Sequence, residues 1–463
     1  MKVNMMNMNK TPIKEQEPNI RNKNFDEVIL GYDDNAAIEE ANRCLNCKNK
    51  PCVSGCPVNI NIPEFISYIK DGNIQKAYEI IRLSNTLPAI CGRVCPQETQ
   101  CEAKCVRGIK GDSVAIGRLE RYVADWVSSN NMYSNKTIKK NGNNVAIIGS
   151  GPSGLACAGD LALIGYNVTI FEALHLPGGV LTYGIPSFRL PKKIVEEEIL
   201  QLTNLGVKIE TNVVIGKTLG FDDLLNNGFD AIYIGTGAGL PNFMGIPGEN
   251  LIGVYSANEF LTRINLMNAY LDDYDTPLIK PSNIAIIGGG NVAMDAARCA
   301  KRLGAENVYV VYRRSKEEMP ARKEEITHAK EEQIEFKLLT NPIRILDDGN
   351  GKVCGLECRE MDLGEVDETG RRKPIEKKGT EFIIDVDSVI IAIGNSPNYL
   401  ISNAESNIRM DNKGHIIVDD NLKTLNEKIY AGGDIVTGAA TVILAMGAGK
   451  KAAKSIDEYL KNK

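Results

Sequence analysis

Eight of the twelve cysteines lie between residues 44 and 105, where their thiol groups could bind metal. They follow the spacings C-x2-C-x4-C-x3-C and C-x3-C-x5-C-x3-C, and the two groups are Cys44, Cys47, Cys52, Cys56 and Cys91, Cys95, Cys101, Cys105. Thiolates bind iron in iron–sulfur clusters and zinc in structural sites. Zinc sites prefer matched C-x2-C pairs, and only the first two cysteines form one. The spacing therefore favours iron–sulfur clusters, with zinc as the alternative.

A first nucleotide motif lies in the run VAIIGSGPSGLACAGDLALIGYNVTIFE, which has the pattern of a buried strand, a glycine turn, a helix and a second strand. Its turn carries the G-x-G-x-x-G fingerprint in Gly149, Gly151 and Gly154. These glycines allow a tight turn, close approach of a pyrophosphate and close helix–strand contact. Glu172 ends the second strand, where a carboxylate can accept hydrogen bonds from ribose hydroxyls. We expect a dinucleotide to bind here.

A second motif of the same kind is IAIIGGGNVAMDAARCAKRLGAENVYVVYRR, which begins at Ile284. Its second strand ends in two arginines, where an acid would otherwise stand. Arginines at this place can bind a 2′-phosphate that a carboxylate would repel, so the motif predicts NADP(H) and leaves the first site for FAD. The predicted NADP(H) residues are Gly288, Gly290, Asn291, Arg313, Arg314 and Arg322, the last of which could equally be a surface cation.

The run IYAGGD, followed by GAATVILAMGAGKKAA, supports a flavin site. Gly433 and Asp434 end this strand, and the aspartate could bind flavin hydroxyls. The helix that begins near Thr441 could direct the positive end of its dipole at the flavin ring. The alternative is an ordinary turn between strand and helix.

Two other kinds of catalytic site are disfavoured because the residues they need are missing. A thioredoxin-reductase-like mechanism needs a redox-active C-x-x-C in the nucleotide domains, and the four remaining cysteines form no such pair. The chain has only three histidines, so a histidine-based hydrolase site is not favoured either.

The elements that must position these residues follow from periodicity. Ile62, Phe65, Ile66 and Ile69 recur at helical spacing between the cysteine groups, which predicts a helical domain. Residues 128–144 are polar and rich in asparagine, as in a linker, and the charged run 364–380 predicts an exposed hairpin. The predicted fold class is α/β, with two Rossmann-like nucleotide-binding domains preceded by an α-helical iron–sulfur domain. The predicted divisions are an extended or loosely attached arm (1–34), the helical domain (35–142), the FAD domain (143–250 and 390–463) and the NADPH domain (251–389).

Composition excludes several classes of protein. The 463 residues suffice for about three domains. The net charge of −5 argues against nucleic acid as a partner, because phosphate neutralisation needs a basic surface. No apolar run is long enough to span a bilayer and the N-terminus lacks the apolar core of a signal peptide, so we expect a cytoplasmic protein with reduced cysteines.

The chain resembles the small-subunit family of NADPH-dependent glutamate synthase over nearly its whole length from about residue 35. The matching motifs are RCLNCKNKPCVSGCPV, GRVCPQETQCEAKC, GSGPSGLACA, GGVLTYGIPSFRLPK, GGGNVAMDAAR, YRRSKEEMPAR and AGGDIVTGAATVILAMGAG. In detail it is most similar to the homotetrameric branch, which is itself similar to the large subunit of NADH-dependent reduced ferredoxin:NADP oxidoreductase, an electron-bifurcating enzyme.

The resemblance implies two [4Fe-4S] clusters, FAD and an inserted NADPH domain, with Gly179 and Leu181 close to the flavin ring. In relatives a Glu or Gln of the I-G-x-L-[EQ] run can replace one thiolate, and Glu120 stands at that position; its alternative is a solvated helix glutamate. Cys91 would then be spare. An interleaved arrangement is implied, with one cluster on Cys44, Cys47, Cys52 and Cys105 and the other on Cys56, Cys95, Cys101 and Glu120.

Three functions stay open. The chain could bring electrons from NADPH to a glutamate synthase large subunit that makes glutamate from 2-oxoglutarate and glutamine. It could instead exchange electrons with a small flavoprotein subunit and ferredoxin, as the bifurcating subunit does. The third alternative is a non-catalytic cluster scaffold, which the intact fingerprints disfavour. Nothing resembles a glutaminase, so the chain alone should not make glutamate, and assembly with copies of itself stays open.

Overall fold

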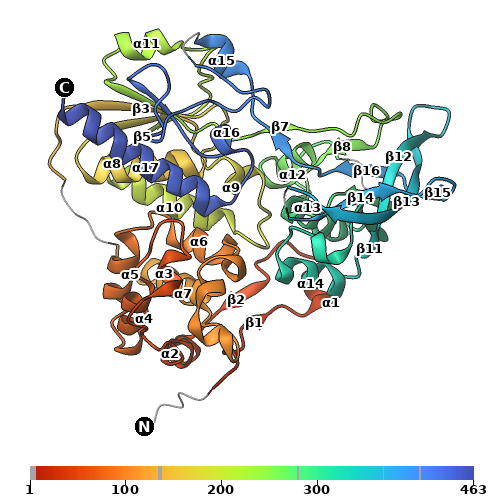
Figure 1. Ribbon diagram of the computed structural model, residues 1–463, viewed down its shortest axis with the longest axis horizontal. Helices are drawn as coiled ribbons and strands as arrows, with labels where there is room; N and C mark the ends of the chain where they lie inside the picture. The colour runs from red at the N-terminus through yellow and green to blue at the C-terminus, as the bar shows by residue number, and fades with distance from the viewer. Residues whose placement is uncertain (1–6, 134–137, 279–280, 369, 406–407) are drawn as a thin grey trace.

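The computed structural model describes residues 7–133, 138–278, 281–368, 370–405 and 408–463. The first residues of the predicted arm and residues 134–137 of the predicted linker lie outside this part of the chain. Figure 1 shows a helical domain and two α/β units, each with its own parallel sheet. The predicted fold class is therefore confirmed.

The helical domain carries all eight clustered cysteines. Its main helices are α2 (Asp34–Asn42), α3 (Pro51–Ser54), α4 (Ile62–Lys70), α5 (Ile74–Arg82), α6 (Pro88–Val94) and α7 (Ile116–Ser129). The four apolar residues that repeat along α4 are all buried, which confirms the helical period. Three short 3₁₀ turns, Gln97–Thr99, Glu102–Lys104 and Val106–Ile109, connect α6 to α7 and carry the last two cysteines at their ends.

The first α/β unit, which we call the first nucleotide unit, has the strand order β18-β6-β3-β4-β5. These strands are β3 (Asn144–Ile148), β4 (Asn167–Phe171), β5 (Lys208–Glu210), β6 (Ala231–Ile234) and β18 (Ile429–Ala431). The helices are α8 (Pro152–Leu163), α9 (Val180–Tyr183), α10 (Lys192–Asn204), α11 (Phe221–Asn226), α15 (Leu400–Ala404), α16 (Asp434–Thr437) and α17 (Val442–Lys461). Figure 1 shows α17 alongside α8, with one end toward the helical domain.

The second α/β unit, the second nucleotide unit, has the strand order β11-β10-β9-β16-β8. Its strands are β8 (Val254–Ser256), β9 (Asn283–Ile287), β10 (Asn307–Tyr312), β11 (Glu335–Leu338) and β16 (Ser388–Ile391). Its helices are α12 (Ala257–Asn265), α13 (Asn291–Arg302) and α14 (Lys323–Glu331). Two short antiparallel strands, β7 (Leu240–Pro241) and β17 (Asn395–Ser396), pair where the chain passes between the two units.

An antiparallel sheet extends the second nucleotide unit. It consists of β12 (Thr340–Asp347), β13 (Val353–Val366), β14 (Arg372–Glu376) and β15 (Phe382–Ile384). Strands β13 and β14 form a hairpin, which confirms the hairpin predicted from the charged run.

The N-terminal segment (residues 10–31) is bonded to the rest of the chain, so of the two predicted alternatives the loosely attached arm is wrong. It contains β1 (Lys14–Glu15), α1 (Pro18–Arg21) and β2 (Ile29–Gly31). Arg21 is 2% exposed and its Nε donates to Glu332, just beyond α14, at 3.1 Å. Val28 is also buried, and its backbone N–H donates to the carbonyl of Phe188 at 2.9 Å. Charge pairs and backbone bonds attach the segment together with the apolar contacts of Phe25 and Val28, and the charge pairs leave no apolar period in the sequence.

Within the described residues, no helix is both long and apolar enough to cross a membrane.

Candidate functional site

Four cysteines from both sequence groups line one small cavity near the surface of the helical domain. They are Cys44, Cys47, Cys52 and Cys105, and all four are partly exposed. Cys105 reaches this cavity because the 3₁₀ turns after α6 bring the end of the second group beside the first. We call these residues the outer cysteine group.

The other four cysteines are buried deeper, and we call them the inner cysteine group: Cys56, Cys91, Cys95 and Cys101. Burial, followed by the charges of Glu102, Glu120 and Cys56, raises the pKa of Cys101 well above its usual value. Burial also raises the pKa of Cys56 to about 11. These thiols are thus protonated without metal, and iron would displace their protons on binding.

Glu120 lies on α7 beside the inner group and is 6% exposed, so the solvated-helix alternative is wrong. Its Oε1 accepts a hydrogen bond from Asn85 Nδ2 at 2.7 Å, and burial raises its pKa to about 8. Cys91 contacts Cys95 and Asn85 Oδ1, and its thiol also donates to Met446 Sδ of α17 at 3.5 Å. The inner group therefore lies against the first nucleotide unit.

The thiol sets fit iron–sulfur clusters better than a single metal ion. Among the described residues, no three or more His, Cys, Asp or Glu side chains could hold one metal ion as they stand. Each protein ligand of a four-iron cluster binds a different iron, so these ligands surround a cube and do not converge on a point. Four partly exposed thiols around one cavity match that requirement.

The first glycine turn is shaped to receive a phosphate. Gly149 has a φ of +98°, and a Cβ there would lie 2.7 Å from the carbonyl oxygen of Gly235. A Cβ at Gly154 would lie 2.0 Å from the carbonyl oxygen of Gly149, so the start of α8 packs directly on the turn. A Cβ at Gly151 would meet nothing within 4 Å, which leaves room for a ligand beside the N-terminus of α8.

The acid and the loop predicted for this site meet the same turn. Glu172 is buried at the end of β4, and its Oε2 accepts the backbone N–H of Ser150 at 3.0 Å. The Ser150 hydroxyl in turn accepts the N–H of Gly178 at 2.9 Å. A Cβ at Gly179 would lie 2.8 Å from the Cα of Gly151. The loop before α9 is thus held against the turn. Leu181, the second residue of α9, is buried.

Residues from the end of the chain complete this edge. Gly433 follows β18, and a Cβ there would lie 3.0 Å from the Ser153 side chain of α8. Burial raises the pKa of Asp434 to about 6, and its Oδ1 accepts the N–H of Ala440 at 3.3 Å. Thr441 caps α17 by accepting the N–H of Leu444 at 3.4 Å. The strand end, the acid and the helix start that the sequence singled out are therefore near neighbours of the first turn.

The second glycine turn repeats the plan. Gly288 has a φ of +144° and packs on Ala392, whereas the only atom within 4 Å of a Cβ at Gly290 is one carbon of Pro320 at 3.9 Å. Asn291 begins α13, and its Oδ1 accepts the backbone N–H of Arg322 at 2.9 Å. This turn too leaves room for a phosphate.

The three predicted phosphate-binding arginines do not converge. Arg313 is exposed, whereas Arg314 is buried and donates to Asp367 at 2.8 Å and to the carbonyl of Arg372 at 2.7 Å, on the hairpin. The Arg322 guanidinium lies beside Gln97 and Glu98 of the helical domain, at 3.3 and 3.4 Å. Its side chain is 9% exposed, so the surface-cation alternative is wrong.

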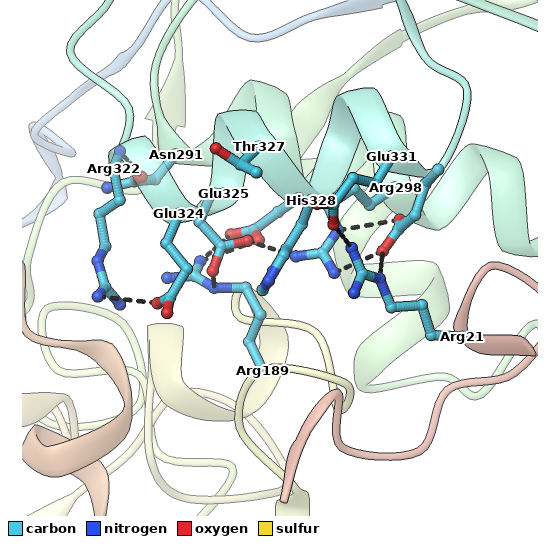
Figure 2. A network of polar contacts seen from close by, with 12 residues as sticks. Arg21, Arg189, Asn291, Arg298, Arg322, Glu324, Glu325, Thr327, His328 and Glu331 are labelled. Carbon is cyan, nitrogen blue, oxygen red and sulfur yellow. Dashed lines mark hydrogen bonds and ion pairs between the residues drawn. The ribbon is translucent and has the colours of Figure 1, made fainter. Parts of the chain in front are cut away.

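Sequence reasoning missed a buried charge network where the N-terminal segment and the nucleotide units meet (Figure 2). Arg189, which precedes α10, donates to Asp295 of α13 at 2.8 Å and pairs with Glu325 of α14 at 2.9 Å. Glu332 accepts from three arginines, namely Arg21, Arg298 and Arg302. The signal was present in α13, where Asp295, Arg298 and Arg302 recur at helical spacing among alanines.

The network borders a cavity of about 210 Å³ to which the helical domain, the N-terminal segment and both nucleotide units contribute.

Lys192 is a further residue that the sequence did not single out. It begins α10, its Nζ donates to the carbonyl of Leu181 at 3.1 Å, and burial lowers its pKa to about 7. Its amino group bonds to the carbonyls of Leu181 and Ile185 and so lies against α9.

Two family models match the chain. The model described as dihydropyrimidine dehydrogenase domain II, 4Fe-4S cluster, covers residues 21–132. The pyridine nucleotide-disulphide oxidoreductase model covers residues 143–449. The first therefore falls on the cysteine-bearing domain and the second on both nucleotide units.

Similar proteins match over the same architecture. The glutamate synthase [NADPH] small chain of Escherichia coli K12 is 36% identical, over 97% of this chain and 96% of its own length. The β subunit of NADP(+)-dependent formate dehydrogenase from Moorella thermoacetica is 39% identical, over 89% of this chain and 60% of its own. A solved structure of FprA from Mycobacterium tuberculosis in complex with NADPH shares the fold at a TM-score of 0.58 and 20% identity, covering 69% of this chain and 85% of that one.

Proposed function

The chain belongs to the family of glutamate synthase [NADPH] small chains, and we propose that it passes electrons from NADPH through FAD and two [4Fe-4S] clusters to a partner that makes glutamate from 2-oxoglutarate and glutamine. The near full-length match to a small chain carries this proposal. The two open glycine turns and the two cysteine groups support it, because each gives one of the implied cofactors a place.

FAD is assigned to the first nucleotide unit. Gly151 leaves room for the pyrophosphate and the N-terminus of α8 supplies a positive dipole end, while the Glu172 carboxylate accepts hydrogen bonds from ribose. The full set is Gly149, Gly151, Gly154, Glu172, Gly179, Leu181, Gly433, Asp434 and Thr441. The chemistry that FAD supplies when bound is the conversion of a two-electron hydride into single electrons, which four-iron clusters can carry.

NADPH is assigned to the second nucleotide unit, with Gly288, Gly290 and Asn291 around its pyrophosphate. Arg313 is the arginine free to meet the 2′-phosphate, because it is exposed where Arg314 is engaged with the hairpin. We assign Arg314 to holding that hairpin in place. Arg322 positions the turn at Asn291 against the helical domain.

The cysteine groups are assigned to separate clusters. Cys44, Cys47, Cys52 and Cys105 would hold the outer one, and Cys56, Cys95, Cys101 and Glu120 the inner one. Glu120 is preferred to Cys91 as the fourth inner ligand because its carboxylate is one of the charges that raise the pKa of Cys56, Cys95 and Cys101 alike, whereas the Cys91 thiol, although it also contacts Cys95, bonds to Met446 outside the group.

The decisive experiment is anaerobic purification of the chain with its companions, followed by addition of NADPH. We expect NADPH to bleach the flavin absorbance, and we expect a large amidotransferase-type companion and NADPH oxidation that requires both glutamine and 2-oxoglutarate. A flavin that NADPH does not bleach would refute the oxidoreductase assignment. A small flavoprotein companion with its own iron–sulfur site would instead establish this chain as the large subunit of NADH-dependent reduced ferredoxin:NADP oxidoreductase.

A further inference from the structure

Glu198 is a buried carboxyl group at the boundary between the first nucleotide unit and the helical domain. It lies on α10, which Figure 1 shows beside α6. The electron path proposed above gives this carboxyl group no role. Four residues of α10 are buried, and Glu198 is the one among them that can ionise: Val195, Glu198, Ile199 and Leu202.

Glu198 stands between the loop before α9 and the helix that leads to the inner cysteine group. One turn before it on α10, Val195 packs under the loop, since a Cβ at Gly178 would lie 3.1 Å from Val195 Cγ1. Glu198 Oε1 accepts the backbone N–H of Ala89, in the first turn of α6, at 2.7 Å. Cys95 caps the other end of α6, about 9 Å further along the helix axis at ~1.5 Å per residue. A charge at Glu198 therefore acts on the flavin side and on the cluster side.

The second carboxyl oxygen of Glu198 has nothing to bond to. Oε2 is buried and lacks a hydrogen-bond partner among the residues that the structure describes. A carboxylate here carries a poorly compensated charge in a medium of low polarity, which favours the neutral acid. Burial accordingly raises the pKa of Glu198 to about 7.

A small cavity beside this carboxyl group is bordered by polar side chains near the surface. Its volume is about 10 Å³, close to the size of one water molecule. Ser128 and Tyr133 line the cavity together with Asp125 and Glu197, and these two acids are 32% and 28% exposed. Ser128 Oγ donates to Glu197 Oε2 at 2.6 Å. These groups give a proton a polar route from solvent to Glu198.

The charged groups around Glu198 act on it in both directions. Besides burial, Arg82 of α5 and Arg93 of α6 lower its pKa, whereas Asp125 of α7 raises it. Arg93 is itself paired with Asp125 at 2.8 Å, so its charge is largely used there. The other titratable groups near Glu198 are Tyr78 of α5, Glu120 of α7, Tyr133 and Glu197.

The charge of Glu198 reaches the proposed ligands of the inner cluster. After burial, it is the charge that raises the pKa of Glu120. No hydrogen bond joins the two carboxyl groups in the part of the chain that the structure describes. A negative charge that raises the pKa of Glu120 also opposes the arrival of an electron beside it, because both place like charges together in a medium of low polarity. Protonation of Glu198 removes that opposition.

We propose that Glu198 binds a proton from solvent when an electron reaches the inner cluster and releases it when the electron leaves. The proposal rests on the proposed function for the cluster itself, and deepens it by naming the residue that balances the charge. In balance, one electron comes from the reduced flavin and one proton from water, and the proton forms an O–H bond at the Glu198 carboxylate. The net charge between flavin and cluster is then unchanged.

The test is a redox titration of the anaerobic holoprotein at several pH values on both sides of pH 7, with the reduced clusters followed by electron paramagnetic resonance. Glu198→Gln keeps an acceptor for the N–H of Ala89 but cannot take up the proton. The matched control is Glu196→Gln, which changes an exposed carboxylate two positions earlier on α10. Infrared difference spectra of reduced minus oxidised protein, in H₂O and D₂O, detect a newly protonated carboxyl group independently of the potential.

We expect the inner cluster of the parent and of the control to become harder to reduce as the pH rises above about 7. With one proton bound per electron, the ratio of reduced to oxidised cluster at a fixed potential should fall about tenfold for each pH unit. At lower pH the ratio should stay level, because Glu198 is already protonated in the oxidised protein. In Glu198→Gln it should stay level throughout, and the infrared band of the new carboxyl group should be missing.

The parent protein alone can refute the proposal, because potentials of both clusters that do not change with pH would overturn it without any variant. An equal pH dependence in the parent and in Glu198→Gln would overturn it as well, and so would a carboxyl band that persists in the variant. Chemical iron analysis shows whether the inner cluster is present. A chain without that cluster would refute the cluster assignment and this proposal together, whereas a cluster that is present but independent of pH refutes only the role of Glu198.

Discussion

Replacement of Arg313 tests the nucleotide assignment most directly, because the structure separates it from its neighbour. Arg313 is exposed at the end of β10, whereas Arg314 is tied to Asp367 and to the carbonyl of Arg372. Hydrogen bonds to a charged group contribute about 1.5–3 kcal/mol, which corresponds to about ten- to 150-fold in affinity. We therefore expect Arg313→Ala to weaken NADPH binding by that factor.

NADH provides the internal control, because it lacks the 2′-phosphate and its binding should stay unchanged. The rate of flavin reduction is measured by anaerobic stopped flow against the concentration of each nucleotide, in Arg313→Ala, Arg313→Lys and Arg314→Ala. Arg313→Lys keeps the charge and should retain part of the preference. Arg314→Ala should affect both nucleotides alike, because it loosens the hairpin. The reasoning is refuted if Arg314→Ala alone removes the preference for NADPH, or if Arg313→Ala weakens both nucleotides equally.

Three further outcomes are expected. Gly151→Ala should yield folded protein that has lost FAD, because its Cβ meets no protein atom, and flavin content against circular dichroism checks this. Cys91→Ser should keep the iron and sulfide of two clusters whereas Glu120→Ala should not, and chemical iron analysis would contradict the ligand assignment if the two results were reversed. Burial raises the pKa of Glu198 to about 7, so the folded protein loses stability as the pH rises from the unfolded value of 4.5 to that point. Glu198→Gln lacks this loss of about 3 kcal/mol, so its melting temperature should exceed that of the parent at about pH 8 but not near pH 4.5. Melting is followed by the fluorescence of Trp126, and melting temperatures that change with pH in parallel in the two proteins would contradict the prediction.

Much of the fold could be predicted because its signals are local. Each glycine fingerprint, its flanking strands and its helix lie within about 30 residues, so the fingerprints and the apolar pattern around them predicted both βαβ openings. The helical period between the cysteine groups was local in the same way. Contacts between segments far apart in the chain leave no comparable signal, so spacing could not show that Cys105 lies beside Cys44. That arrangement came from the family resemblance.

The arginines show why the site was harder to predict than the fold. Arg313 and Arg314 are adjacent in sequence, but successive residues at a strand end point to opposite sides, so one stays exposed and the other is buried. Arg322 and the N-terminal segment are held by groups more than 200 residues away, Glu98 and Glu332 among them. Charge pairs between such distant residues have no period in the sequence.

The docking of the N-terminal segment bears on the order in which the parts of the chain fold. Chains are synthesised from the N-terminus and their domains tend to fold in that order. Arg21 leaves the ribosome 311 residues before Glu332, the carboxylate that receives it. The helical domain can therefore be complete while its own leading segment still lacks a place to dock. Arg21 is therefore synthesised long before it can settle, and its pairing with Glu332 requires that α13, β10 and α14 have all been built.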